Sequence, residues 1–434
     1  MKPIINIKFD QSECVYYSGQ VVSGKVEISF SKAKKVRGIV IKITGLAKAQ
    51  WKGKYHSWPE DDNKRRTRTS QFQGNEEYLS VTTYLFGSET ATPVEILPGI
   101  HTFNFACSIP PFAPSSFEGT YGHIRYVAKV ILDRPWKFDQ TYSVGFTVLK
   151  TLDLNYDSPL LRIPAEVEVV KTFWCGICTS GPLYLKVKIP QTGFVPGQAI
   201  PVRTEIVNSS NVKVPEISFY LRKLITYRAD TPGADYKEET VDLARKSYGN
   251  VSPKGSTNFE ETLMVPAVPP TSQFQSKIIQ INYDIKVEVE LSGGHTNPFV
   301  LCPVTIGTVP LFTSSQQPMG LPYGVDMDAS QSHSAPASSY FQNNAALSNT
   351  EAPLSLPVIA PVYNRAPSTP NSNLPPPTYE ESILMMRARV DEGEEHSLQR
   401  TDYVPRYPVY NFNAPSAPQE FEIAEDVLQG KYVI

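Results

Sequence analysis

The sequence predicts an all-β chain, built from two tandem β-sandwich domains and followed by a disordered, proline-rich tail. Three observations carry this prediction. Apolar and polar residues alternate with a period of two, one pattern recurs 178 residues further along the chain, and the composition changes after Leu311. The expected boundaries are 1–150 for the first domain, 151–166 for a linker, 167–309 for the second domain and 310–434 for the tail.

The prediction of strands rests on alternation. From Ile279 to Leu291 apolar residues occupy every second position, with polar residues at nearly every position between them. A period of two sends alternate side chains to opposite faces of a strand, so this segment has one buried and one wet face. Residues 36–43 and 126–132 are further candidates. Glycine, proline and asparagine separate such runs, and no sustained helical period appears before the tail, as expected for a sandwich or barrel.

The prediction of two domains rests on an internal repeat. The dipeptide Gly-Gln at residues 19–20 recurs at residues 197–198, with similar strand patterns after it. Later, SIPPFAPSSF from residue 108 is echoed by MVPAVPPTSQF from residue 264. A repeat of this length is too long for a solenoid, so we interpret it as one β-domain that has been duplicated.

The prediction of a disordered tail rests on composition and charge. Glutamine, serine, asparagine, alanine and proline dominate after Leu311, with 15 prolines in the last 124 residues. Too little apolar surface is available there to offset chain entropy. Residues 1–310 carry 35 basic and 29 acidic residues, a net of +6, whereas the tail carries 6 and 14, a net of −8. Two segments of the tail stand out from this background, 374–390 and 403–413.

The first of these segments contains a PPxY motif, formed by Pro376, Pro377 and Tyr379 within LPPPTYEESI. Proline fixes φ near about −65°, so the run is already close to polyproline II and loses little entropy on docking. WW domains bind such segments in an aromatic groove. The motif therefore predicts a WW-domain ligand on an accessible arm. Residues 380–390 are expected to form a short helix, because two glutamates favour its first turn.

Two near-matches flank the motif, PVY at residues 361–363 and PRY at residues 405–407, each lacking the first proline. Two or three weak motifs on one arm gain about 10²–10⁴ in avidity against tandem WW domains. The secondary WW-binding candidates are therefore Pro361, Tyr363, Pro405 and Tyr407.

A basic segment, NKRRTRTSQ, covers residues 63–71. A solvated loop between strands is the first interpretation. The second is a patch for an anionic lipid or a phosphorylated partner, formed by Lys64, Arg65, Arg66 and Arg68. Aromatic residues do not alternate with these cations, so no nucleic-acid partner is expected.

A Cys-x-x-Cys pair, Cys175 and Cys178, has the spacing of half a zinc site or of a redox motif. Structural zinc needs two further ligands, and the remaining cysteines and histidines are dispersed singly. A redox motif lies where a strand opens a helix, and no helix is expected there. Two small thiols are the favoured interpretation, with a metal site at these residues as the weak alternative.

No catalytic constellation or cofactor motif appears elsewhere. GQVVSGKV, residues 19–26, approaches a phosphate-binding loop, but valine replaces the hydroxyl residue that would hold magnesium. A turn that opens a strand explains this segment better. Five cysteines do not form a disulfide framework, and neither a signal peptide nor a membrane-spanning apolar run is visible. We therefore expect a cytosolic protein that is not an enzyme and needs no cofactor.

Three blocks of the sequence together resemble the α-arrestins, or arrestin domain-containing proteins. SIPPFAPSSFEGTYGHIRYVAKVIL (108–132), with DRPW after it, is similar to the N-domain signature of that family. KTFWCGICTSGPLYLKVKIPQTGFVPGQ (171–198) is similar to the opening of the C-domain. The PPxY motif follows in the expected order. The resemblance covers residues 5–390 and implies two arrestin-type, immunoglobulin-like β-sandwiches.

The resemblance implies an adaptor that links membrane cargo, such as receptors or transporters, to HECT-type ubiquitin ligases. The WW domains of the ligase would bind Pro376, Pro377 and Tyr379, and the cargo would be ubiquitinated, internalised and sorted. Such an adaptor is cytoplasmic and is recruited peripherally to the plasma membrane and endosomes. The family tail usually has two full PPxY motifs, and this chain has one.

Two other hypotheses stay open at this point. One is an endosomal sorting scaffold of the retromer-subunit kind, which acts without a ligase. The other is a redox enzyme that uses Cys175 and Cys178. Neither the cargo nor the preferred ligase follows from the sequence.

Overall fold

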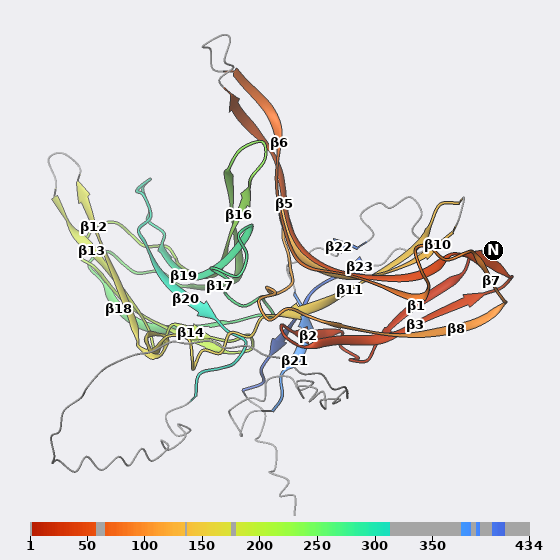
Figure 1. Cartoon of the computed structure of the whole chain (residues 1–434). Coiled ribbons are helices and arrows are strands. Elements are labelled where there is room, and N and C mark those ends of the chain that lie inside the picture. Colours follow the sequence, from red (N-terminus) through yellow and green to blue (C-terminus); the bar gives the residue numbers. More distant parts are fainter. Residues whose placement is uncertain are drawn as a thin grey trace, which may run out of the picture.

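The computed structural model describes residues 2–57, 66–134, 137–174, 179–312, 375–382, 388–390 and 402–412. It shows two β-sandwiches, one after the other along the chain, which confirms the predicted fold class (Figure 1). Among these residues the single helical element is the 3-10 turn η1 (Pro159–Arg162), which lies in the predicted linker.

The N-terminal sandwich, here the N domain, packs a three-stranded sheet against a six-stranded sheet. The first sheet has the order β1-β3-β8, and the second has the order β2-β11-β10-β5-β6 with β9 paired to β10. A short pair, β4-β7, closes one end. The strands are β1 (Ile4–Phe9), β2 (Val15–Tyr17), β3 (Val21–Phe30), β4 (Lys34–Val36), β5 (Gly38–Ser57), β6 (Arg66–Gly87), β7 (Val94–Ile96), β8 (Gly99–Ser108), β9 (Phe117–Glu118), β10 (Gly122–Asp133) and β11 (Gln140–Leu149).

The second sandwich, here the C domain, packs a four-stranded sheet against a five-stranded sheet. Their orders are β12-β13-β15-β18 and β14-β20-β19-β16-β17. In each domain a short strand joins the last long strand in parallel, β2 with β11 and β14 with β20. The strands are β12 (Ala165–Trp174), β13 (Thr179–Ile189), β14 (Gly193–Phe194), β15 (Ala199–Asn208), β16 (Ile217–Ala229), β17 (Asp235–Tyr248), β18 (Ser256–Met264), β19 (Ile279–Val289) and β20 (Phe299–Ile306).

Strand β19 has the buried face that alternation predicts. Every second residue from Ile279 to Val289 is at most 2% exposed, and these side chains line the core of the C domain. One polar residue of the other face, Asp284, is also buried. It accepts two hydrogen bonds from the Arg222 guanidinium on β16, at 2.8 and 2.7 Å, which compensates for the loss of water.

The repeated Gly-Gln dipeptide forms the same turn in both domains. Gly19 and Gly197 have φ values of +90° and +87°, which glycine adopts readily. The next side chain closes each turn: Gln20 Oε1 accepts from the Tyr17 amide at 2.8 Å, and Gln198 Oε1 accepts from the Val195 amide at 3.2 Å. Each turn leads into a strand, so the segment 19–26 is a strand entry, as predicted.

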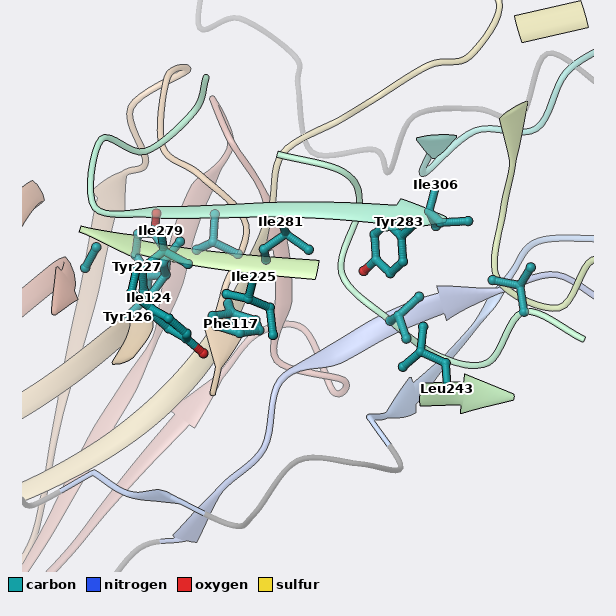
Figure 2. Packing of buried hydrophobic residues seen from close by; sticks show 14 of the residues in the cluster. Phe117, Ile124, Tyr126, Ile225, Tyr227, Leu243, Ile279, Ile281, Tyr283 and Ile306 are labelled. Carbon is teal, nitrogen blue, oxygen red and sulfur yellow. The ribbon is translucent and has the colours of Figure 1, made fainter. Parts of the chain in front are cut away.

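The two domains pack against each other through a mixed apolar and polar contact. Figure 2 shows Phe117 of the N domain near Tyr227 of the C domain, and their ring centroids are 6.5 Å apart. The Glu239 carboxylate accepts from the Tyr227 hydroxyl at 2.6 Å and from Thr120 Oγ1 at 2.5 Å. Lys223 is buried over the Phe117 ring, and burial lowers the pKa of its ammonium to about 8. These contacts join the domains into one body.

Four short strands of the tail lie against this body. They form two antiparallel pairs, β21 with β24 and β22 with β23. Figure 1 shows β21 beside β2 and the β22-β23 pair beside β11. Their bounds are β21 (Thr378–Glu381), β22 (Ala388–Arg389), β23 (Asp402–Tyr403) and β24 (Arg406–Val409). Apart from Asp402, they fall within the two segments that stood out from the tail composition.

Candidate functional site

The PPxY motif lies at the start of β21. Pro375, Pro376 and Pro377 precede the strand without strand pairing, and Pro376 is exposed. Thr378–Glu381 are extended and pair with β24, so the predicted helix from residue 380 is wrong at its start. The reason is tertiary, because the backbone groups of these residues find their hydrogen-bond partners in β24 rather than in a helical turn.

Tyr379 of the motif is half-buried against the N domain. Its hydroxyl lies 3.1 Å from the hydroxyl of Tyr17 on β2, and the two share a hydrogen bond. The ring packs on a small apolar cluster made by Val15, Tyr17, Leu149 and Tyr407. Burial raises the pKa of the Tyr379 hydroxyl, so the side chain stays neutral in this seat.

Three further tyrosines of the tail, here the tyrosine anchors, are Tyr403, Tyr407 and Tyr410. They are 7%, 0% and 4% exposed, respectively. Each donates its hydroxyl to a backbone carbonyl of the body. The distances are 3.1 Å from Tyr403 to Phe146 O, 2.9 Å from Tyr407 to Ser116 O and 2.6 Å from Tyr410 to Thr308 O.

The near-match at residues 405–407 is therefore part of the packed tail. Tyr407 is fully buried and Pro405 is buried beside it, so the structure does not present them on the surface. The Pro-x-Tyr pattern predicted secondary WW-binding residues here, and their packing role was not predicted. The signal was present, since Tyr403, Pro405 and Tyr407 alternate as in a strand with one buried face.

The other predicted site residues are only partly covered by the structure. Pro361, Tyr363, Cys175 and Cys178 lie outside the described residues, as do Lys64 and Arg65. Arg66 opens β6, and Arg68 follows it as an exposed side chain near the end of the long β5-β6 hairpin. Cys14, Cys107 and Cys302 are free thiols. In the described part of the chain no group of three or more histidine, cysteine, aspartate or glutamate side chains is arranged to hold a metal ion.

A basic cleft, which sequence analysis did not single out, lies on the outer face of the six-stranded sheet. It has a volume of about 370 Å³. Alternate residues of β5 and β10 line it, because the residues between them face the core. The cations among its lining residues are Lys42, Lys48, Arg125 and Lys129. No local run of basic residues marks this cleft, because its cations come from two strands that are far apart in the chain.

Two further groups shape this basic cleft. His123 also lines it, and burial lowers the pKa of its imidazole to about 3, with Arg125 and Lys48 adding to the effect. The ring is therefore neutral at physiological pH. Arg125 is held by the carboxylate of Glu118, at 2.8 and 2.9 Å, and also donates to the carbonyl of Arg389 in the tail at 3.2 Å. The tail thus reaches the edge of this cleft, where Val390 is one of the lining residues.

None of the helices among the described residues has the length and apolarity of a membrane span.

Comparisons with known proteins agree with this architecture. Residues 5–155 match the family model described as "Arrestin (or S-antigen), N-terminal domain", and residues 179–311 match the corresponding C-terminal domain. Arrestin domain-containing protein 17 of Caenorhabditis elegans is 30% identical, over 93% of this chain and 98% of that protein. Arrestin domain-containing protein 4 of Mus musculus is 31% identical, over 69% and 70%. Arrestin domain-containing protein 1 of Rattus norvegicus is 23% identical, over 72% and 64%.

Both family models match in the order of the two sandwiches, and the similarity to the nematode relative extends into the tail. The chain belongs to the arrestin family, as one of the arrestin domain-containing proteins, which act as trafficking adaptors rather than enzymes.

Proposed function

We propose that this chain links membrane cargo to a HECT-type ubiquitin ligase, with the two-domain body holding the cargo and the tail recruiting the ligase. The observation that carries the proposal is a complete PPxY motif, Pro376, Pro377 and Tyr379, on the tail of an arrestin body. The ligase would then ubiquitinate the cargo and direct its internalisation and sorting.

The chemistry of the motif supports a WW domain as the partner. The prolines lie outside regular strand pairing, and Pro376 is exposed, so an aromatic groove can reach them. Tyr379 supplies a flat ring with a polar tip, a side chain that is common at the centre of protein interfaces. A single short motif of this kind binds in the micromolar range, at about −8 kcal/mol. Ligases with several WW domains would gain from the near-match at residues 361–363 as well.

The charge of the body supports an acidic partner on the cargo side. Lys42, Lys48 and Lys129 gather on the basic cleft, where the charge of Arg125 is balanced by Glu118. Carboxylate or phosphate groups on a cytoplasmic segment of a receptor or transporter complement this charge. Arg68, exposed near the end of the β5-β6 hairpin, belongs to the basic segment 63–71, which we propose as a second cationic region suited to anionic lipid. Both are consistent with a cytoplasmic adaptor that is recruited peripherally to the plasma membrane and endosomes.

The ligase contact is tested by matched substitutions at neighbouring positions of the motif. Tyr379→Ala removes the ring that enters the groove, whereas Thr378→Ala changes the variable position, whose side chain is exposed. In co-precipitation with a HECT ligase, Tyr379→Ala should lower recovery by at least about tenfold and Thr378→Ala should leave it unchanged. Ubiquitination of co-expressed cargo should fall in parallel.

Equal recovery with both variants would reject the ligase role. If cargo sorting then continued with the tail removed, the chain would act as a ligase-independent sorting scaffold.

A further inference from the structure

The PPxY motif is built into a folded element rather than a free arm. β21 (Thr378–Glu381) pairs antiparallel with β24 (Arg406–Val409), with Tyr379 opposite Pro408. We call this two-stranded element the tail ribbon. It lies at the junction of the two domains, against the surface that β2 presents.

The tail ribbon is held by contacts to both domains. Among the tyrosine anchors, Tyr403 and Tyr407 donate to carbonyls of the N domain, and Tyr410 donates to a carbonyl at the end of the C domain. The Tyr410 amide also donates to Pro196 O, at 3.0 Å, beside the Gly197 turn. Tyrosine buries a large apolar ring and satisfies its hydroxyl at the same time, so these contacts specify one position for the ribbon.

Docking of the ribbon uses the same groups that a WW domain needs. The Tyr379 ring packs on Val15, Tyr17 and Leu149, and its hydroxyl is bonded to Tyr17. The backbone of Thr378–Glu381 is engaged by β24. A WW groove takes the prolines and the tyrosine of one extended segment together. In the docked ribbon Pro376 is exposed, whereas Tyr379 is half-buried and its hydroxyl is bonded to Tyr17.

We propose that the body of this protein masks its own PPxY motif by binding the tail ribbon, and that a WW domain and the body compete for Tyr379. This inference rests on the proposed ligase role, because it describes the regulation of the same site. The apparent dissociation constant for a WW domain is the intrinsic constant divided by the fraction of undocked ribbon. A ribbon docked in 99 of 100 molecules therefore weakens ligase binding about 100-fold.

The tail meets the N domain along an edge that stays open to solvent. A surface hollow of about 190 Å³ follows this edge, lined by Cys14, Gly145 and Phe146 on one side and Tyr403 and Arg406 on the other. Since the anchors are divided between the domains, a partner that moves one domain relative to the other weakens the seat.

The test is to titrate one isolated WW domain of a HECT ligase with four ligands. They are a peptide of residues 370–385, the wild-type full chain, the full chain with Tyr403→Ala, and the full chain with Tyr407→Ala. Tyr403 belongs to no Pro-x-Tyr match, so its loss does not alter any WW-binding sequence. The control is Tyr236→Ala, at a tyrosine of β17 that is 61% exposed.

The peptide should bind the WW domain at least about tenfold more tightly than the wild-type chain does. The affinities of both anchor variants should approach that of the peptide. The control should bind the WW domain with the affinity of the wild type.

Hydrogen exchange on the wild-type chain provides a second measurement that needs no substitution. The amides of 378–381 and 406–409 should be protected, and an excess of WW domain should remove that protection.

Equal affinity of the peptide and the wild-type chain would overturn the masking proposal and leave the ligase role intact. The proposal would also fail if the wild-type chain bound the WW domain weakly and the anchor variants bound it equally weakly, because docking of the ribbon would then not be the cause of the weak binding. Failure of the peptide itself to bind would instead reject the ligase role on which the proposal rests.

Discussion

The two Gly-Gln turns are built alike and differ in what lies against them. Each glycine amide donates to the carbonyl of an aligned residue, Gly19 to Ile109 O at 3.1 Å and Gly197 to Val265 O at 2.8 Å. Around Gly19 a side chain would have space, since the nearest atom to an added Cβ, in Pro111, is 4.0 Å away. At Gly197 the added Cβ would lie 2.1 Å from the carbonyl oxygen of Tyr410.

The two copies therefore share one turn and differ in what it contacts. Both turns have the same internal hydrogen bond from the glutamine side chain. The C-domain turn is in addition a contact for the tail. A substitution at Gly19 should therefore affect the fold alone, whereas a substitution at Gly197 should affect both the fold and the docking of the tail.

The largest expected effect comes from breaking the buried ion pair of each domain. Glu118→Ala removes the Glu118 carboxylate from a pair whose side chains are both 8% exposed, and should lower the free energy of unfolding by about 3–5 kcal/mol. Asp284→Ala should cost less, because the Arg222 side chain is 17% exposed and can regain water. Urea denaturation of both variants provides the comparison. Equal losses would show that exposure does not distinguish the two pairs.

A smaller effect is expected from alanine at the two turn glycines. Gly19→Ala forces a side chain into positive φ and should cost about 1–2 kcal/mol. Gly197→Ala has the same strain and also displaces Tyr410, so it should be more destabilising and should increase binding to an isolated WW domain. Gly19→Ala is the matched control, because it should leave that binding unchanged. An increase with both variants would mean that the turn itself, rather than the Tyr410 contact, controls the tail.

The smallest effect tests whether the domains remain equivalent in their cores. Tyr126 and Tyr283 are aligned and buried, and each donates its hydroxyl to a proline carbonyl, Pro114 O at 2.8 Å and Pro269 O at 2.6 Å. Tyr126→Phe and Tyr283→Phe should each lower the free energy of unfolding by about 1 kcal/mol. Calorimetry on the two variants measures this. A loss confined to one of them would indicate that only that copy depends on the bond.

Sequence patterns predicted the strands of the body well because apolar and polar residues alternate along them. In β19 the residues that alternate are the ones that are buried, and the Gly-Gln repeat marks the same turn twice. The PPxY motif was equally visible, since its proline spacing is a local property of the chain. The position of Tyr379 was not predictable in this way. Its partner Tyr17 lies 362 residues earlier, and no local pattern specifies so distant a contact.

The basic cleft was missed for the same reason. Lys42 and Lys48 on β5 become neighbours of Arg125 and Lys129 only because β5 and β10 pair in register. Along the chain the strands β6 to β9 lie between these residues, so their combined charge appears only in the folded sheet.

The class of fold, the duplication and the PPxY motif follow from the sequence alone, since each is visible in local patterns of the chain. The tertiary structure decided whether that motif is presented. Tyr379 has the apolar ring and the hydroxyl that suit either a WW groove or the seat beside Tyr17. Which of the two it occupies depends on the N-domain surface around Tyr17, and on the free energy of docking the ribbon there through its contacts to both domains.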